Sequence, residues 1–336
     1  SNIDPDATVI FVMNHRSNFD YLLVTYLASR RSALSYAAGE WTLFWPMGNL
    51  LRAMGAYFVR RGSDDPLYRR VLERYVQMAV EGRVPQGIYP EGGLSRDGAI
   101  QKPKLGLLDY MIRTFDPTGD QDIVFVPVGI NYERVVEDQD LLQHRDEQMI
   151  SKRGTLFVIK SAFGFFVRST PQLAYRRRAR FGRACANFGA PVSLRDWLTR
   201  QQVDLRTLER KERFVYISRL ADELMGDIAG LIPVLPVSLV ATAFWETPDR
   251  QLSELDLKVR AHQLVGEFES AAAHVYMPHG EENLALEDGL QQLLARKMIV
   301  EETPGRYSAN SRELALLEFY VRPVLHFLPA HRRETE

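Results

Sequence analysis

The sequence of 336 residues lacks several features that would place it in a specialised class. Its only cysteine is Cys185, which excludes an internal disulfide framework and predicts a reducing, cytoplasmic environment. Its formal net charge is −1, so the chain as a whole has no excess positive charge for binding nucleic acid. No repeats or low-complexity segments occur, and with 46% hydrophobic and 25% charged residues the chain is predicted to be globular.

Long hydrophobic runs are also scarce. The uncharged stretch at residues 228–245 approaches the length of a membrane span, but Pro233 and Pro236 would break a spanning helix there. We therefore predict a buried segment that contains the start of a helix. The N-terminus has no signal-peptide pattern, and it begins with Ser1 just before a predicted strand, so we expect further sequence upstream.

The first half alternates short apolar runs with longer amphipathic stretches, which is typical of βαβ units. A helix is predicted after Asp65, with Pro66 in its first turn and Gly82 at its end. Strands are predicted at residues 8–13, 34–37, 56–59, 85–89, 123–130 and 184–188.

After Pro191 the pattern favours helices, at residues 205–225, 239–244, 254–274, 284–296 and 312–327. Residues 299–308 are typical of a hairpin, and a helix followed by a hairpin also occurs in winged-helix modules, but acidic side chains crowd this region and disfavour DNA binding. The sequence thus predicts an α/β domain at residues 1–190, with a mixed sheet flanked by helices. A mostly helical C-terminal domain is predicted at residues 191–336.

The first predicted strand runs directly into the sequence NHRSNFD, residues 14–20. Ser17 or Asn18 can cap a helix that starts there, which puts His15 at a strand end and Asp20 in the first helical turn. A carboxylate in that position can accept the imidazole N–H and raise the basicity of the other ring nitrogen. Taken alone, the pair is more typical of a surface histidine beside an acid than of a catalytic pair.

Three further sequence blocks favour the catalytic interpretation of the pair. The first is GAYFVRR at residues 55–61, a strand that carries Arg60 and Arg61 at its carboxyl end, where open α/β sheets bind ligands. The second is YPEGGLSR at residues 89–96, whose glycines let backbone N–H groups approach an anion. The third is VPVGINYER at residues 126–134. Each block alone fits a solvated strand end or a plain turn, but their order and spacing together are specific.

The four blocks resemble the bacterial glycerol-3-phosphate acyltransferase branch of the glycerolipid acyltransferase superfamily. The resemblance is strong over residues 8–134 and weaker through NFGAP at residues 187–191 and the helical half. It implies transfer of a fatty acyl group from acyl-CoA or acyl-carrier protein to the sn-1 hydroxyl of glycerol 3-phosphate. The product would be 1-acylglycerol 3-phosphate, a phospholipid precursor. A thioester is already an activated donor, so we expect no covalent acyl-enzyme, no metal and no other cofactor.

The resemblance implies His15 as the catalytic base and Asp20 as its partner acid. Backbone N–H groups near Gly92 and Gly93 are predicted to hold the oxyanion, and basic side chains to bind phosphate. The family usually has an arginine where this chain has Leu94, so Arg96, Arg60, Arg61 or Lys104 is expected to carry more of the phosphate binding here. The predicted substrate-binding residues are Arg16, Ser17, Arg60, Arg61, Glu91, Gly92, Gly93, Ser95, Arg96, Lys104 and Pro127.

Residues 144–183 form a basic segment in which ten Lys or Arg residues face two acidic ones, for a local net charge of +8. Phenylalanines such as Phe165 and Phe166 are interleaved. The mixture suits an anionic membrane surface or the phosphates of CoA, and it also suits a helical hairpin with a core of aromatics and solvated arginines. We predict a peripheral enzyme on the inner face of the cell membrane.

Other functions remain open on the sequence. The acceptor could be dihydroxyacetone phosphate or lysophosphatidate, since a base and a phosphate site serve all three acceptors. The chain could also be a catalytically silent membrane- or lipid-binding protein, or a helical partner of another enzyme, although the intact His15 and Asp20 argue against silence. A hydrolase is disfavoured because no G-x-S-x-G motif is present.

Overall fold

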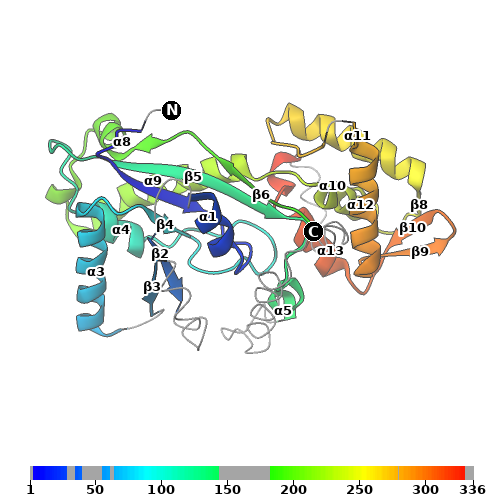
Figure 1. Ribbon diagram of the computed structural model, residues 1–336, viewed down its shortest axis with the longest axis horizontal. Helices are drawn as coiled ribbons and strands as arrows, with labels where there is room; N and C mark the ends of the chain where they lie inside the picture. Colours follow the sequence, from blue (N-terminus) through cyan, green and yellow to red (C-terminus); the bar gives the residue numbers. More distant parts are fainter. Residues whose placement is uncertain are drawn as a thin grey trace.

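The computed structural model describes residues 3–28, 35–39, 55–60, 64–143, 182–278 and 280–329. Its larger sheet has the strand order β3-β2-β4-β1-β5-β6, with β7 also paired to β5 (Figure 1). Strands β1 to β5 run parallel, whereas β6 and β7 run antiparallel to β5. The bounds are β1 Thr8–Met13, β2 Ser35–Gly39, β3 Ala56–Val59, β4 Gln86–Ile88, β5 Ile123–Tyr132, β6 Ala184–Phe188 and β7 Val192–Ser193.

Every predicted strand is present, and β1, β3 and β6 have the predicted bounds. The two-residue strand β7 was missed. Strand β5, which lies between β1 on one side and β6 and β7 on the other, is buried along all ten residues, as expected for a strand covered on both faces. It extends two residues beyond the predicted end, to Asn131 and Tyr132. These two residues bring polar groups to the carboxyl edge of the sheet.

One face of the sheet is covered by helices α3 and α9, which share a hydrophobic core with Ile10 and Phe125. The predicted helix after Asp65 is confirmed as α3, Pro66–Glu81: the Asp65 side chain accepts from two backbone N–H groups in the first turn, and Gly82 ends the helix. The other helices of this half are α1 Asp20–Ala28, α4 Gly106–Ile112 and α5 Asp138–Gln143.

The chain after residue 190 continues over the same face. The helix predicted at residues 205–225 is a 3-10 turn, η2 Leu205–Thr207, followed by α9 Arg210–Leu231, because Leu208 is extended and breaks the helix. Helix α8, Leu194–Gln201, and α9 belong to the core that contains β1 and β5. A division of the chain at residue 190 therefore does not separate two cores.

The remaining helices gather beyond the carboxyl end of β5 (Figure 1). The predicted buried segment is confirmed: α10, Pro236–Trp245, is buried over its first nine residues, and no described helix has the length and hydropathy to span a bilayer. Two predicted helices are shorter than expected, because Ala272 takes a positive φ after α11 and Pro323 follows α13. The hairpin is confirmed, in a sheet of order β8-β10-β9. The bounds are α11 Glu254–Ser270, α12 Glu282–Ala295, α13 Leu314–Val321, η3 Leu325–Phe327, β8 Leu252–Ser253, β9 Ile299–Thr303 and β10 Arg306–Ala309.

Candidate active site

His15 and Asp20 meet at the carboxyl end of β1, where the chain turns into α1. The His15 Nδ1 and Asp20 Oδ2 atoms are 2.9 Å apart, and both side chains are buried. Because a carboxylate only accepts hydrogen bonds, Nδ1 is the donor, which leaves Nε2 as the basic nitrogen. The contact predicted from the sequence is therefore present, in the tautomer that a general base requires.

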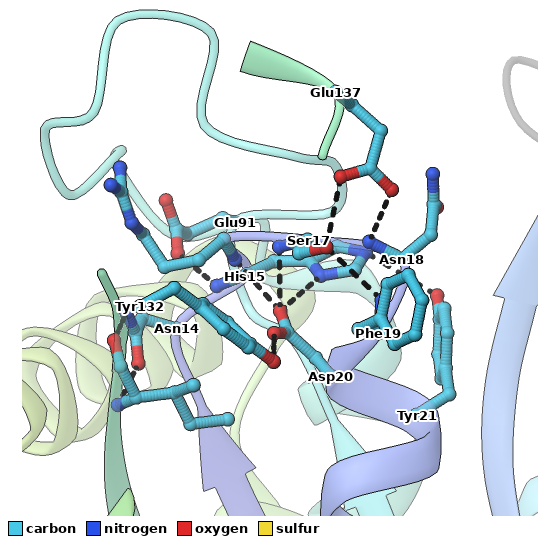
Figure 2. A network of polar contacts seen from close by, with 12 residues as sticks. Asn14, His15, Ser17, Asn18, Phe19, Asp20, Tyr21, Glu91, Tyr132 and Glu137 are labelled. Atoms are coloured by element: carbon cyan, nitrogen blue, oxygen red, sulfur yellow. Dashed lines mark hydrogen bonds and ion pairs between the residues drawn. The ribbon is translucent and has the colours of Figure 1, made fainter. Parts of the chain in front are cut away.

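Asp20 is held by more than the histidine. Its Oδ2 also accepts from the backbone N–H groups of Arg16 at 2.7 Å and Ser17 at 3.1 Å, and its Oδ1 accepts from the Tyr132 hydroxyl at 2.6 Å. The pKa of Tyr132 is raised by burial and by the adjacent carboxylate, which keeps the phenol protonated as a donor. Both carboxylate oxygens are thus fixed, and with them the plane of the imidazole (Figure 2).

Aromatic rings surround the His15 imidazole. Tyr89 stacks on the His15 ring at 4.2 Å between centroids, and Tyr21 meets the ring edge-on at 5.4 Å. The Tyr21 hydroxyl lies 3.4 Å from His15 Nε2. His15 is only 2% exposed, so bulk water is excluded from the imidazole.

Glu91, in the predicted glycine-rich block after β4, holds the backbone at His15 by a hydrogen bond. Its carboxylate accepts the His15 backbone N–H at 2.8 Å and the Gln101 backbone N–H at 2.8 Å. Burial raises its pKa to about 7, against the lowering effect of these two bonds. The Ser95 N–H donates to the His15 carbonyl, and the Ser95 hydroxyl donates to the Ala99 carbonyl. Glu91 and Ser95 therefore hold the backbone of the site, and the structure gives their side chains protein partners.

At the turn that contains Gly92, the chain lies very close to the side chain of Lys104. Gly92 has a φ of +66°, and a Cβ there would lie 2.7 Å from the Lys104 Cδ, so the lysine stem packs across the turn. The Gly92 N–H donates to the Tyr89 carbonyl, which closes the turn and removes that N–H as an oxyanion donor. Arg96 is half-buried and follows Ser95 directly, and Lys104 is exposed. The loop that carries Gly92 and Arg96 is thus joined to the His15 backbone through Ser95, and Lys104 packs on this loop at Gly92.

Other predicted residues lie elsewhere. Arg60 is exposed at the end of the edge strand β3, which is separated from β1 by β2 and β4, and its guanidinium lies 5.4 Å from the Tyr68 ring centroid. Pro127 lies within the sheet opposite Val12, and its carbonyl accepts from Gly189. Arg61, like most of residues 144–183, lies outside the described residues.

Arg16 and Ser17 point away from the base. The Arg16 guanidinium is buried over the Phe319 ring and donates to the carbonyls of Gly98 at 2.9 Å and Phe319 at 3.4 Å. Ser17 donates its hydroxyl to Glu137 Oε2 at 2.9 Å. This placement favours a structural role for both side chains. It corrects the expectation that they face the substrate.

The sequence matches models of known protein families. The acyltransferase model matches residues 1–131, and the model of the glycerol-3-phosphate acyltransferase C-terminal region matches residues 171–329. Residues 1–131 belong to the acyltransferase family. The two matched segments contain the His15 junction and the helices beyond β5 respectively.

Similar curated proteins are named glycerol-3-phosphate acyltransferase. The one from Pseudomonas syringae pv. syringae is 31% identical over 96% of this chain and 39% of its own length. One from Pseudomonas putida is 30% identical over 98% of this chain and 40% of its own length, and one from Pseudomonas fluorescens is 33% identical over 96% and 38%. The chain therefore spans about two-fifths of the length of these relatives.

In this acyltransferase chain, helix α13 touches the loops that build the site. The Tyr320 hydroxyl accepts from the Val135 N–H at 3.0 Å and contacts Asp138, and Arg322 pairs with Asp97 at 3.1 Å. The Phe319 carbonyl lies so close to the glycine loop that a Cβ at Gly98 would be 2.3 Å from it. One short helix thus fixes the loops after β1, β4 and β5.

Sequence reasoning missed Tyr132, Tyr89, Tyr21 and Glu137. The three tyrosines stand in or beside the recognised blocks, so a search for hydroxyls next to the base could have found them. Glu137 follows no motif. Its carboxylate, whose pKa is raised by burial, accepts from the Ser17 hydroxyl and the Asn18 N–H. Only the folded loop after β5 reveals that contact.

Proposed function

We propose that this chain performs the acyl transfer of a glycerol-3-phosphate acyltransferase. It moves a fatty acyl group from acyl-CoA or acyl-carrier protein to the sn-1 hydroxyl of glycerol 3-phosphate. The observation that supports this most strongly is the His15 ring, with Nδ1 bonded to Asp20 and Nε2 left as an acceptor. The names of the similar proteins support the acceptor.

In the proposed reaction, His15 Nε2 takes the proton of the acceptor hydroxyl while the oxygen attacks the thioester carbon. Asp20 stabilises the imidazolium that forms, at a distance of 2.9 Å. When the carbon–sulfur bond breaks, the imidazolium returns the proton to the thiolate. Because the thioester is already activated, a positioned base and a stabilised oxyanion are sufficient.

The acceptor phosphate is assigned to Arg96 and Lys104, with Arg60 at the outer end of the sheet. Arg96 directly follows Ser95, which is bonded to the His15 backbone, and the Lys104 stem crosses Gly92. A guanidinium and an ammonium within one short loop can meet a dianionic phosphate with charge-assisted hydrogen bonds. Dihydroxyacetone phosphate and lysophosphatidate also carry a phosphate, so they are the alternative acceptors.

The product is a lipid with one long chain and is poorly soluble, so the enzyme is proposed to act at the inner face of a membrane. The basic segment at residues 144–183 supplies a local net charge of +8 for an anionic surface. Most of this segment lies outside the described residues.

The function is tested by supplying palmitoyl-CoA with each acceptor in turn and identifying the lipid product by mass. We expect 1-acylglycerol 3-phosphate, and at least about 100-fold slower turnover in His15→Ala, the usual scale for loss of a general base. His262→Ala, at an exposed histidine of α11, is the matched control and should retain parental turnover. Near-normal turnover of His15→Ala would refute the assigned base, and a different product would identify a different acceptor.

A further inference from the structure

Tyr21 places a hydroxyl beside the reactive nitrogen of His15. The residue follows Asp20 directly, in the first turn of α1, and its side chain is only 5% exposed. Its hydroxyl lies 3.4 Å from His15 Nε2, on the side of the ring opposite the Asp20 contact, and Figure 2 shows it turned toward the imidazole. The same helix start therefore supplies both the group that orients the base and a hydroxyl at the base.

The Tyr21 ring is held in place by its neighbours. It stacks on Tyr36 with centroids 5.0 Å apart and an interplanar angle of 26°, and it meets Tyr89 edge-on at 5.2 Å. Tyr89 in turn stacks on the His15 ring. A ring fixed by two aromatic contacts has little freedom left to lose, so its hydroxyl is preorganised for a substrate atom near Nε2.

Several other donors close to the base are already committed. The backbone N–H groups of Arg16 and Ser17 both donate to Asp20, and the Ser17 hydroxyl donates to Glu137. The Gly92 N–H, predicted from the sequence as an oxyanion donor, closes its own turn. The Tyr21 hydroxyl is distinguished by its position, because it lies 3.4 Å from Nε2, the atom that takes the proton of the acceptor in the proposed reaction.

We propose that Tyr21 is a further catalytic residue, which donates a hydrogen bond to the thioester carbonyl oxygen as that oxygen becomes an oxyanion. The proposal rests on the proposed acyl transfer and adds a second group to it. In the tetrahedral intermediate, the attacking oxygen and the oxyanion are bonded to the same carbon. A hydroxyl next to Nε2, where the attacking oxygen delivers its proton, is therefore within reach of the oxyanion.

The step balances without ionising the tyrosine. The acceptor oxygen forms a bond to the carbonyl carbon and gives its proton to His15 Nε2, and the carbonyl π electrons move onto the oxygen that Tyr21 contacts. Collapse reforms the carbonyl, breaks the carbon–sulfur bond and returns the proton from Nε2 to sulfur. Tyr21 keeps its proton throughout and supplies only the hydrogen bond.

The test is Tyr21→Phe, which removes the hydroxyl and retains the ring contacts with Tyr36 and Tyr89. Loss of one oxyanion donor should lower kcat by about 10²- to 10³-fold, while KM for glycerol 3-phosphate and for palmitoyl-CoA changes less than about threefold. Tyr26→Phe, at a tyrosine 72% exposed on the same helix, is the matched control and should retain parental kcat. Thermal unfolding should be the same for both variants and the parent.

Two further measurements separate this role from others. Slow hydrolysis of palmitoyl-CoA, in which water replaces the acceptor, passes through the same oxyanion and should fall in parallel in Tyr21→Phe. Hydrolysis that persists while acylation falls would place Tyr21 on the acceptor and overturn the proposal. The acid limb of the pH profile of kcat/KM should stay where it is in the parent, whereas a shifted limb would show that Tyr21 acts by tuning His15.

The hydrolysis measurement also distinguishes failure of the proposed acyl transfer from failure of the Tyr21 proposal. If the parent hydrolyses the thioester but acylates no acceptor, the proposed function fails, and Tyr21→Phe still tests the oxyanion donor. Parental rates in Tyr21→Phe would overturn the donor alone. A parent that neither acylates nor hydrolyses would overturn both.

Discussion

Replacing Asp20 by Asn should remove the negative charge beside the base while leaving its hydrogen bonds in place. Three N–H groups converge on Oδ2, including the backbone N–H groups of Arg16 and Ser17, so the amide oxygen of Asn must occupy that position. The amide NH2 then faces the Tyr132 hydroxyl, which can accept as well as donate. His15 consequently keeps an acceptor at Nδ1 and its productive tautomer.

The cost of the change is electrostatic. The carboxylate and the imidazolium that forms in the reaction are in contact at 2.9 Å, with their charge centres somewhat further apart. Two unit charges about 4 Å apart interact by about 4 kcal/mol at an effective dielectric constant near 20, which corresponds to about a 10³-fold change in rate. Since only part of the charge has developed in the transition state, kcat of Asp20→Asn should fall by about 10²- to 10³-fold, with KM values near parental.

The assay is thiol release from palmitoyl-CoA in the presence of glycerol 3-phosphate, together with thermal unfolding of each protein. Asp20→Ala is the comparison, because it leaves the buried N–H groups of Arg16 and Ser17 unpaired and should lose about 1–3 kcal/mol of stability for each. If kcat of Asp20→Asn stays within threefold of the parent, the charge is not used. If Asp20→Asn unfolds as easily as Asp20→Ala, the hydrogen bonds are not retained.

Other substitutions test the phosphate site and the surrounding support. Arg96→Ala should raise KM for glycerol 3-phosphate more than Arg60→Ala does, because Arg60 lies on the edge strand; steady-state kinetics in which only the KM for palmitoyl-CoA rises would move both arginines to the donor. Leu94→Arg should lower KM for the acceptor in the same assay, and an unchanged KM would show that this position does not reach the phosphate. Glu91 has a pKa of about 7 in the folded protein against 4.5 when unperturbed, so its contribution to the free energy of unfolding should fall by up to about 3 kcal/mol as pH rises from 4.5 to 7. Urea unfolding at pH 5 and 7.5 should show a smaller difference in Glu91→Gln, and equal differences would contradict the assignment. Tyr320→Phe, which loses two buried hydrogen bonds, should lower the free energy of unfolding by about 1–3 kcal/mol, and an unchanged urea midpoint would show that those bonds contribute nothing.

The parts of the site that the sequence predicted are the local ones. His15 and Asp20 are five residues apart across one strand-to-helix junction, so their contact follows from secondary structure alone. Contacts between distant segments could not be predicted in this way. Ser17 meets Glu137 across 120 residues, and Arg16 meets Phe319 across 303, and no periodicity or motif connects either pair.

The charge of a residue also gave a wrong prediction of its position where the side chain is buried. Arg16 directly follows His15 and was predicted to bind substrate, but its guanidinium is buried against backbone carbonyls, which only the folded chain reveals. The strands were predicted well because alternating apolar runs mark them directly. The break at Leu208 was not predicted, because an extended leucine and a helical leucine look the same in the apolar pattern.

The contacts of α13 restrict how relatives can exchange parts. Arg16 and Gly98 from the first matched segment fit against Phe319 from the second, and Asp97 pairs with Arg322. A chimera that joins the first half of one relative to the second half of another must preserve these pairs. If it does not, the loop that carries His15 loses its support although residues 14–20 are intact. The two matched segments are therefore expected to be inherited together. Substitutions in α13 are expected to lower enzymatic activity.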